Sequence, residues 1–471
     1  MRRHRAKSRK LFHEADKASF TCNVPLTAHF DGKQVKNAKF KFVEVLPIVL
    51  TGVNVDKLID VVELDKGTGK NIADEVFHSV CNWEVEDNIA ACCYDTTSVN
   101  TGVNNGAFAN LEDLLGRPLL ACACRHHFRE LELKAVCIYC LGKTEGPAVP
   151  LFKYFQKAWS SIDKTKFKSG FASSIVPPGV ASEMLQFAKT QLLQFQPRGD
   201  YRELLDLTVT VLGGNPNPKF KVPGALHHAR WMSKAIYGLK IYMFRDEIDL
   251  TDDELYGILM LSQYLILVYI KAWFTCQSTC QAPANELELL VQYQEYEKVN
   301  PGISAAVLDK QLNHLWYLGQ KMVCLSLFDR NLSNAVKRDI ADAVLHSEKP
   351  ESKDNRGIVT LVDGSLPTTL PQLSSFVTKG SSKFFEILGI SSSFLDKDPS
   401  SWPEDTDYQA SQMVAKHVRI TNDVAEGAVA LATGLNGLIT RDKYQKKCLI
   451  LGVHENRKAR PNSTKRELCK S

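Results

Sequence analysis

Two aspartates follow short apolar segments, where a carboxylate can be held by a rigid element and still reach solvent. Asp31 follows the segment 26–30, and Asp95 follows the segment 91–94 and opens a polar turn. Carboxylates on rigid neighbouring elements suit Mg²⁺, which prefers hard oxygen ligands. Functional sites of α/β sheets form at such strand ends. The alternative for each aspartate is that it only begins a turn.

A third acidic residue, Glu426, stands far downstream in the segment 422–426. On its own, the spacing of Asp423 and Glu426 fits a capping box at the start of a helix. A carboxylate that folds back onto the N-cap amide points less freely at a metal ion. The residues alone therefore leave two roles open for Glu426, a helix cap or a metal ligand.

Several segments together resemble the DNA transposases of the hAT superfamily and a group of animal proteins related to them. Residues 95–102 match a DTTxxNTG turn, residues 124–130 match a CRHHxxE helix, and residues 29–33 are similar to an HWDGK segment. Similar short motifs lie at 230–231 (RW), 314–318 (HLWYL) and 422–426 (NDVAE). The resemblance covers nearly the whole chain.

The resemblance implies an α/β fold with a ribonuclease-H-like catalytic core, interrupted by a large all-helical insertion domain. It implies that Asp31, Asp95 and Glu426 bind Mg²⁺ or Mn²⁺ for DDE-type cleavage and strand transfer of DNA. Residues expected to support this site are Cys124, His127 and Asn100. The expected partner is DNA, and the expected location is nuclear or cytoplasmic.

Two sets of residues are candidates for DNA contact. Arg230 and Trp231 resemble an Arg-Trp pair that lies near the DNA hairpin in hAT transposases, where the ring can stack on a flipped base. The alternative for Trp231 is a place on the buried face of a helix. At the N-terminus, Arg2, Arg3 and Arg5 belong to a basic cluster that could neutralise phosphates, or could simply be solvated, in a chain whose net charge is only +5.

The elements that must position these residues change in character along the chain. After a basic segment at 1–25, residues 26–146 read as alternating strands and helices, the first part of the core, with Pro47 indicating a bulge or an edge position. Residues 147–405 carry long helical patterns and form the expected insertion, with a loop at 347–382. Residues 406–471 are expected to supply the C-terminal helices that complete the core.

Two departures from the family pattern favour a second interpretation. Gly427 follows Glu426 where the family usually has Arg, and only about 25 residues precede the strand that leads to Asp31, too few for a separate DNA-binding domain. The alternative function is a catalytically inactive, domesticated or decaying transposase derivative that binds DNA or dimerises. Either protein could form homo-oligomers.

Zinc and membrane insertion are two further possibilities that the sequence argues against. Cys124-x-x-His127 and Cys137-x-x-Cys140 offer four zinc ligands, but a helical pattern fills the stretch between the pairs, where a zinc knuckle needs a turn. The 13 cysteines sit in apolar contexts typical of reduced thiols. The apolar stretch 256–274 could span a bilayer, but polar interruptions and an acidic start favour a buried helix.

Overall fold

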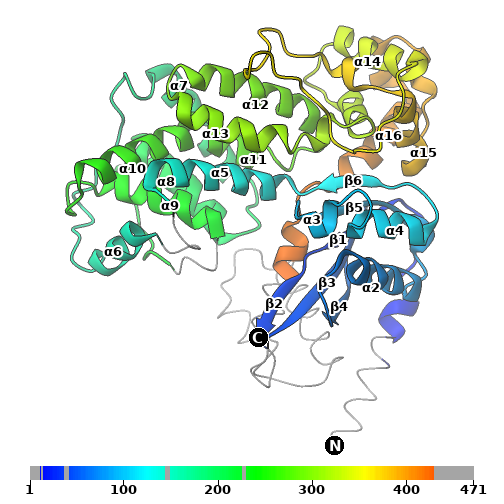
Figure 1. Cartoon of the computed structure of the whole chain (residues 1–471), viewed down its shortest axis with the longest axis horizontal. Helices are drawn as coiled ribbons and strands as arrows, with labels where there is room; N and C mark the ends of the chain where they lie inside the picture. The colour runs from blue at the N-terminus through cyan, green and yellow to red at the C-terminus, as the bar shows by residue number, and fades with distance from the viewer. Residues whose placement is uncertain (1–10, 12–13, 37–41, 144–148, 225–229, 429–471) are drawn as a thin grey trace, which may run out of the picture. The chain divides into compact units, whose positions relative to one another are not determined.

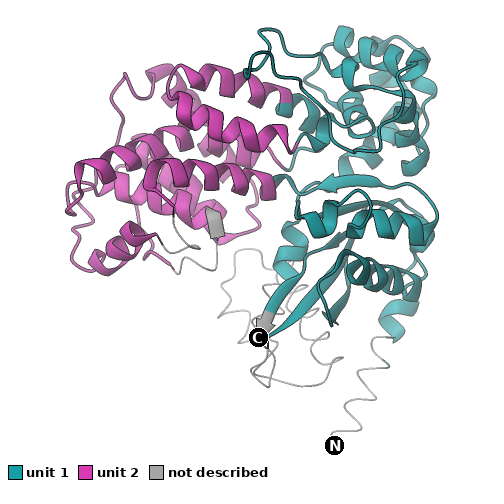
Figure 2. Ribbon diagram, viewed as in Figure 1, with its two compact units in different colours: residues 1–125, 277–286, 315–471 teal, residues 126–276, 287–314 magenta. Residues whose placement is uncertain are grey.

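The computed structural model describes residues 11, 14–36, 42–143, 149–224 and 230–428. The chain forms two compact units, shown in Figure 2: unit 1 comprises residues 1–125, 277–286 and 315–471, and unit 2 comprises residues 126–276 and 287–314. Unit 1 contains a mixed β-sheet, and the elements of unit 2 are helices. The predicted α/β class is therefore confirmed. The predicted helical stretch 147–405 includes most of unit 2 and a part of unit 1.

The sheet of unit 1 has an antiparallel part, formed by β1 to β4, and a parallel part, formed by β1, β5 and β6. Its strand order is β2-β3-β1-β5-β6, and β4 pairs with the other edge of β3. Strands β1, β5 and β6 are parallel, whereas β3 is antiparallel to its partners. The strands, labelled in Figure 1, are β1 (Leu26–Phe30), β2 (Lys33–Lys36), β3 (Phe42–Gly52), β4 (Val55–Leu64), β5 (Ile89–Tyr94) and β6 (Leu120–Ala123).

Strands β1 and β2 are two halves of one interrupted strand. Phe30 pairs with Ile48, and Lys33 pairs with Val45, so both halves share one hairpin register along β3. Asp31 lies in the interruption, where the opposite residue of β3 is Pro47. Because proline has no backbone N–H, it cannot continue the ladder at this point. Pro47 does adjoin an irregularity, between Ile48 and Val49 in the β3–β4 register, but the predicted edge alternative is wrong because β3 is paired on both sides.

The two faces of the sheet carry different apolar layers, because side chains alternate along each strand. Helices α2 (Gly69–Asn82) and α4 (Ala107–Leu115) cover one face, where they contact Leu46, Ile48 and Leu50 of β3. On the opposite face, Val45, Val49 and Leu58 pack with Val424 and Ala428. Residues 423–428 are helical, so the last described segment of the chain returns to the sheet that the first segment begins.

The rest of unit 1 is a set of short helices and turns. A 3-10 turn, η1 (Glu86–Asn88), precedes β5, and α3 (Ser98–Thr101) follows it. The predicted loop 347–382 is mostly irregular, with one isolated bridge between Val362 and Ser365 and two 3-10 turns. The remaining elements are η3 (Trp316–Leu318), η4 (Met322–Phe328), α14 (Asn334–His346), η5 (Leu373–Phe376), η6 (Lys379–Ser382), α15 (Lys383–Leu388), η7 (Ser393–Asp396), η8 (Pro399–Glu404) and α16 (Thr406–His417).

Unit 2 is built around one large apolar core that is rich in aromatic side chains, among them Trp159, Tyr237 and Trp273. Its helices are α5 (Arg125–Leu141), α6 (Pro150–Ala158), α7 (Pro178–Leu192), α8 (Gly199–Val211), α9 (Arg230–Met243), α10 (Asp252–Tyr264), the π-turn η2 (Leu265–Tyr269), α11 (Ile270–Phe274), α12 (Ala282–Glu297) and α13 (Pro301–Leu312). Stripes of apolar residues at helical spacing explain these helices, since each stripe must be covered by a neighbour.

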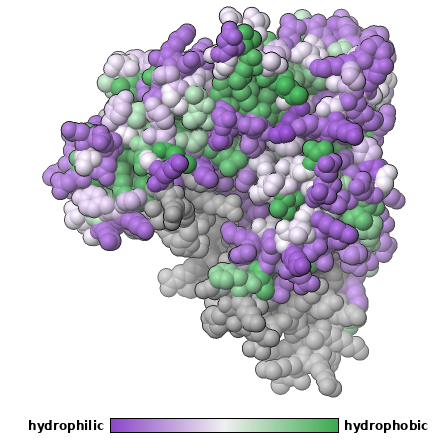
Figure 3. All heavy atoms as spheres, in the orientation of Figure 1, coloured by the Kyte–Doolittle hydropathy of each residue, from purple (hydrophilic) through white to green (hydrophobic). Residues whose placement is uncertain are grey.

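One helical run in the described part of the chain, Asp252–Phe274, is long and apolar enough to cross a membrane by length and composition. Within its most apolar window, 56% is buried inside the protein. A core helix of a globular protein has the same pattern, so the run is weak evidence for a membrane span. The surface shown in Figure 3 is mostly hydrophilic, with hydrophobic residues in small separate groups. Such scattered groups are usual on globular proteins.

Candidate active site at the carboxyl end of the sheet

Asp31 and Asp95 lie at the carboxyl ends of two neighbouring parallel strands. His29 of β1 pairs with Cys93 of β5, and each aspartate lies two residues beyond its strand's member of that pair. Leu26, Ala28 and Phe30 point into the layer under α2 and α4, so alternation turns His29 and Asp31 to the opposite face. The structure therefore brings the two predicted aspartates to the same edge of the sheet.

The turn after β5 holds the Asp95 carboxylate through one of its two oxygens. Oδ1 accepts hydrogen bonds from the Thr97 backbone N–H (3.1 Å), the Thr97 hydroxyl (2.7 Å) and the Asn100 Nδ2 (2.6 Å). All three bonds end on Oδ1, so Oδ2 is the oxygen with which Asp95 can bind a cation. Asn100, expected from the sequence to support the site, is buried, and its own Oδ1 has no hydrogen-bond partner among the described residues.

The segment that carries Glu426 is attached to β1 by Asn422. The Asn422 Nδ2 donates to the carbonyl oxygen of Phe30 (3.0 Å), the residue before Asp31. The Asn422 carbonyl accepts from the Glu426 N–H (2.9 Å), so Glu426 lies one helical turn further on. Val424 and Ala428, on the same turn, pack against the sheet face to which Asp31 is directed. Glu426 itself is partly buried.

The predicted capping box at this turn is wrong in its register. The helical segment begins at Asp423, so Asn422 occupies the N-cap position. The Asn422 side chain turns towards β1, and one Asp423 carboxylate oxygen accepts from Gln277 Nε2 (3.3 Å). The contact with β1 depends on residues nearly 400 positions apart, which explains why local spacing did not reveal it.

His29 is the buried polar centre of this edge. Its Nδ1 lies 3.2 Å from Asn422 Oδ1, and its Nε2 lies 2.8 Å from the Thr51 hydroxyl. Burial lowers the pKa of His29 from 6.5 to about 4, because desolvation disfavours the imidazolium more than the Asn422 hydrogen bond favours it. His29 is therefore neutral near pH 7 and acts as a fixed hydrogen-bonding group.

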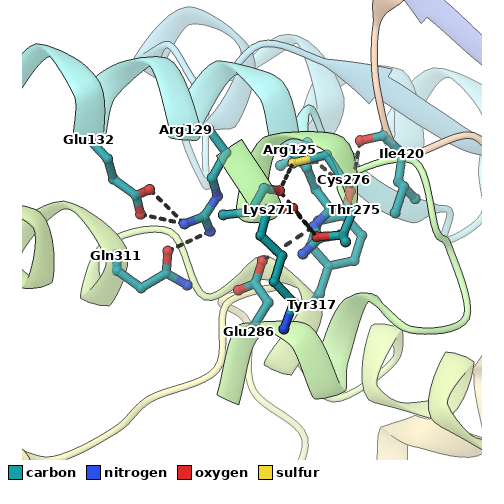
Figure 4. A network of polar contacts seen from close by, with 12 residues as sticks. Arg125, Arg129, Glu132, Lys271, Thr275, Cys276, Glu286, Gln311, Tyr317 and Ile420 are labelled. Atoms are coloured by element: carbon teal, nitrogen blue, oxygen red, sulfur yellow. Dashed lines mark hydrogen bonds and ion pairs between the residues drawn. The ribbon is translucent and has the colours of Figure 1, made fainter. Parts of the chain in front are cut away.

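Cys124 and its neighbours close the edge on the side of β6. The Cys124 Sγ accepts from the Asn422 N–H (3.2 Å), and the Cys124 N–H donates to the Tyr94 carbonyl (2.8 Å). Arg125, Tyr317 and Ile420 are drawn in Figure 4. The Arg125 N–H donates to the Ile420 carbonyl (3.0 Å), and the Tyr317 hydroxyl donates to the carbonyl of Ala123 (2.6 Å), the last residue of β6.

The predicted supporting residue His127 belongs to the first turns of α5 and is partly buried. Cys137, proposed with it as a zinc ligand and then rejected, lies on the same continuous helix. Ten residues of α-helix place the two about 15 Å apart along the axis, so one ion cannot bind both. Burial also raises the pKa of the Cys137 thiol to about 12, which disfavours the thiolate that zinc requires.

The three predicted acids lie on segments that meet at this edge of the sheet. Within residues 11–428, as far as the structure describes them, no group of three His, Cys, Asp or Glu side chains is placed to hold a metal ion. The strand register and the Asn422 contacts bring the three backbone segments to one edge.

The predicted DNA-contact residues are not described in full. Arg230 and Trp231 form the first turn of α9, which agrees with the helix expected there, but their side chains lie outside the described structure. Arg2, Arg3 and Arg5 also lie outside the described residues. Their roles in DNA contact remain predictions from sequence.

Four residues of the site were not singled out from the sequence for the roles they have here: His29, Thr51, Tyr317 and Asn422. A histidine in an otherwise apolar strand was a signal for His29, because a fully buried imidazole needs partners for its nitrogens. Thr51 and Tyr317 carry no such signal, since a threonine in a strand and a tyrosine in an apolar motif are both usual.

Comparison with known proteins does not identify the chain. It matches no protein-family model. No curated protein matches it significantly.

Proposed function

We propose that this protein is a DNA transposase-like enzyme that cleaves DNA and transfers strands by a DDE mechanism dependent on Mg²⁺ or Mn²⁺. Its core would be ribonuclease-H-like, interrupted by a helical insertion, and it would act on DNA in the nucleus. The proposal rests on the resemblance of the motifs and on the architecture of the sheet edge.

The architecture supports the proposal through the order of its elements. An antiparallel meander of β1/β2, β3 and β4 comes first, and α2, β5 and β6 follow it along the chain. Strands β5 and β6 run parallel to β1. Such an arrangement is expected of a ribonuclease-H-like core. A long helical stretch then separates β6 from the segment 423–428, as the resemblance implies for Glu426.

One observation carries the proposal: the side chain of Asn422 bonds to the residue before Asp31, and its carbonyl bonds to the amide of Glu426. Acids almost 400 residues apart are therefore connected through two hydrogen bonds. Asp95 lies at the same edge because β1 and β5 are parallel and His29 pairs with Cys93. Three carboxylates at one edge suit the hard-oxygen preference of Mg²⁺.

In the proposed reaction, Asp95 binds metal through Oδ2 while Thr97 and Asn100 hold its Oδ1. Asp31 and Glu426 supply the other carboxylates from β1 and from the helical turn. Bound Mg²⁺ ions would activate a water molecule or a DNA 3′-hydroxyl and stabilise the leaving oxygen. The buried residues His29 and Asn422 keep the supporting elements fixed.

The second candidate is a catalytically inactive derivative that binds DNA or dimerises. The position after Glu426 favours it: Gly427 supplies no cation beside the site, although a side chain would meet no described atom within 4 Å there. Such a protein would bind DNA without cleaving it.

Nicking of supercoiled DNA by the purified chain distinguishes the two functions. We expect the wild-type chain to nick DNA only with Mg²⁺ or Mn²⁺, and Asp95→Ala to lose this activity while keeping its circular dichroism spectrum and unfolding midpoint. DNA binding without nicking in either metal would favour the inactive derivative and would contradict the enzymatic proposal.

A further inference from the structure

Asn422 uses every one of its hydrogen-bonding groups, and the partners lie on three separate segments. Nδ2 donates to the Phe30 carbonyl, Oδ1 faces His29, the backbone N–H donates to Cys124 Sγ, and the backbone carbonyl accepts from Glu426. The residue is 2% exposed. Four directed contacts in a buried position fix both the place and the orientation of Asn422.

The hydrogen bonds also determine which atoms donate. A carbonyl can only accept, so the amide atom facing Phe30 must be Nδ2, and Oδ1 must be the atom facing His29. His29 then donates from Nδ1, and its Nε2 accepts from the Thr51 hydroxyl. These three hydrogen bonds connect Thr51, His29, Asn422 and Phe30 in a row, and a neutral imidazole satisfies the donor and acceptor roles that they require.

We propose that Asn422 is a positioning residue: held by His29 and the Phe30 carbonyl, it sets the place of Glu426 relative to Asp31 and so sets the metal affinity of the site. The inference rests on the proposed function, because it assigns Asn422 a part in the same site. Asn422 touches neither substrate nor metal in this role and acts through Glu426.

Apolar packing holds the turn 423–428 on the sheet, whereas the Asn422 hydrogen bonds set its exact position there. Val424 and Ala428 hold the turn on the sheet by apolar contact, which is not directional. Without the Asn422 amide, the turn would stay packed but could slide or rotate on β3 and β4. Loss of the amide should therefore weaken metal binding far more than it weakens the fold.

The test uses the full-length chain with Asn422→Ser and measures Mn²⁺ binding by isothermal titration calorimetry. Serine is a good N-cap residue, so the start of the helix is preserved while both amide contacts to β1 are lost. Supporting residues around metal ligands usually change metal affinity by 10- to 100-fold, and we expect a loss of at least about tenfold here. Asn422→Ala, which loses the same contacts and offers no hydroxyl to cap the helix, should lose at least as much.

The matched control is Gln320→Ala, which removes another buried amide of unit 1. Gln320 Nε2 donates to the Ser352 carbonyl (2.7 Å), and its Oε1 accepts from the Thr378 hydroxyl (2.6 Å). None of these partners belongs to the sheet edge. We expect this variant to keep wild-type Mn²⁺ affinity even if its stability falls. Equal losses of affinity in Gln320→Ala and Asn422→Ser would mean general destabilisation and would overturn the inference.

Hydrogen exchange gives a second readout that needs no metal. Serine keeps the backbone carbonyl that accepts from Glu426 but loses the side-chain contacts that anchor the turn to β1. Exchange in peptides covering 423–428 should therefore be faster in Asn422→Ser and unchanged in Gln320→Ala. Unchanged exchange would show that apolar packing alone fixes the turn, and the inference would fail.

Failure of the inference and failure of the proposed function give different results. If wild type binds Mn²⁺, Asp95→Ala does not, and Asn422→Ser binds within twofold of wild type, the proposed function stands and the positioning role falls. If wild type binds no Mn²⁺, the proposed function is wrong, and so is the proposed effect of Asn422 on metal affinity. Exchange at 423–428 would then report only whether Asn422 fixes the turn.

Discussion

Each compact unit contains a buried polar network, and the two networks differ in charge and in what they connect. In unit 2, the Arg129 guanidinium binds both oxygens of Glu132 (2.7 and 2.6 Å) and Oε1 of Gln311 (2.7 Å), with side chains about 1% exposed for the ion pair (Figure 4). In unit 1, the chain from Thr51 through His29 to Asn422 is neutral and reaches the strand end beside Asp31.

The difference indicates two uses of buried polarity. The ion pair lies within α5, and the Arg129 bond to Gln311 joins α5 to α13, so this charged network ties two helices together. A neutral network fixes geometry without placing a charge beside the carboxylates proposed to bind a cation. Loss of the first should reduce stability, and loss of the second should reduce function.

The largest expected effect is on catalysis, from Asp95→Asn. Asparagine keeps the shape and the Oδ1 acceptor that Thr97 and Asn100 use, but removes the charge that a metal ion needs. We expect the rate of Mg²⁺-dependent nicking to fall by about 10³-fold or more, equivalent to about 4 kcal/mol in the barrier. Unfolding should stay within about 1 kcal/mol of wild type. Retention of more than a tenth of the activity would exclude Asp95 as a metal ligand.

The next largest effect is on stability, from Glu132→Ala in unit 2. Removing one member of a buried ion pair leaves the other charge uncompensated, which typically costs about 3–5 kcal/mol. Urea unfolding should show this loss, while Mn²⁺ affinity per folded molecule stays unchanged. The double variant Arg129→Met with Glu132→Leu should cost less than Glu132→Ala, because no buried charge remains. A double variant at least as unstable as Glu132→Ala would argue against this view of the pair.

A smaller effect concerns pH and His29. Its pKa is lowered from 6.5 to about 4 in the folded chain, so the unfolded chain binds the proton first as the pH falls. The stabilisation is full above about pH 6.5 and is lost progressively towards pH 4, by about 3 kcal/mol in total. The stability difference between wild type and His29→Gln, measured by urea unfolding from pH 7.5 to 4.5, should therefore shrink at low pH. A difference independent of pH would show that His29 does not titrate in this way.

The smallest effect is at Gly427. Alanine in a helix is favoured over glycine by about 1 kcal/mol, and an added Cβ at 427 would meet no atom of the described residues within 4 Å. Gly427→Ala should slow hydrogen exchange in 423–428 by about fivefold. Gly427→Arg adds a cation beside Glu426 as well, and we expect it to raise nicking above the level of Gly427→Ala. If both variants nick alike, the family's arginine would have no electrostatic part in this chain.

The sequence predicted the α/β class and the placement of Asp31 and Asp95, because strand ends carry a local signal. An apolar segment followed by an aspartate and a polar turn identifies both positions without any long-range information. The segment 33–36, by contrast, was not predicted as a strand. Its four residues are polar or charged except Val35, and only pairing with β3 makes them a strand.

The role of Asn422 could not be derived from sequence, since it depends on pairing across the length of the chain. Local spacing favoured Asp423 as the N-cap residue, whereas in the structure the N-cap is Asn422 and the helix begins one residue earlier. The hydrogen bonds of Asn422 to Phe30 and Cys124 fix the residue at which this helix begins. Likewise, the charges of Arg129 and Glu132 appear three residues apart in a helix, a pattern more often found on a solvated face than in a core.

Gly69, the first residue of α2, limits what the turn after Asp95 can tolerate. A Cβ at this position would lie 2.3 Å from the Asn105 carbonyl oxygen and 2.8 Å from that of Val99, so only a hydrogen atom fits. The glycine at this position is therefore explained by crowding between two backbones. Any larger residue at 69 would displace the 99–107 loop, and with it Asn100, which holds Asp95. A substitution 26 positions before Asp95, at a residue that contacts none of the three acids' side chains in the proposed role, would thus disturb the candidate site through its supporting backbone.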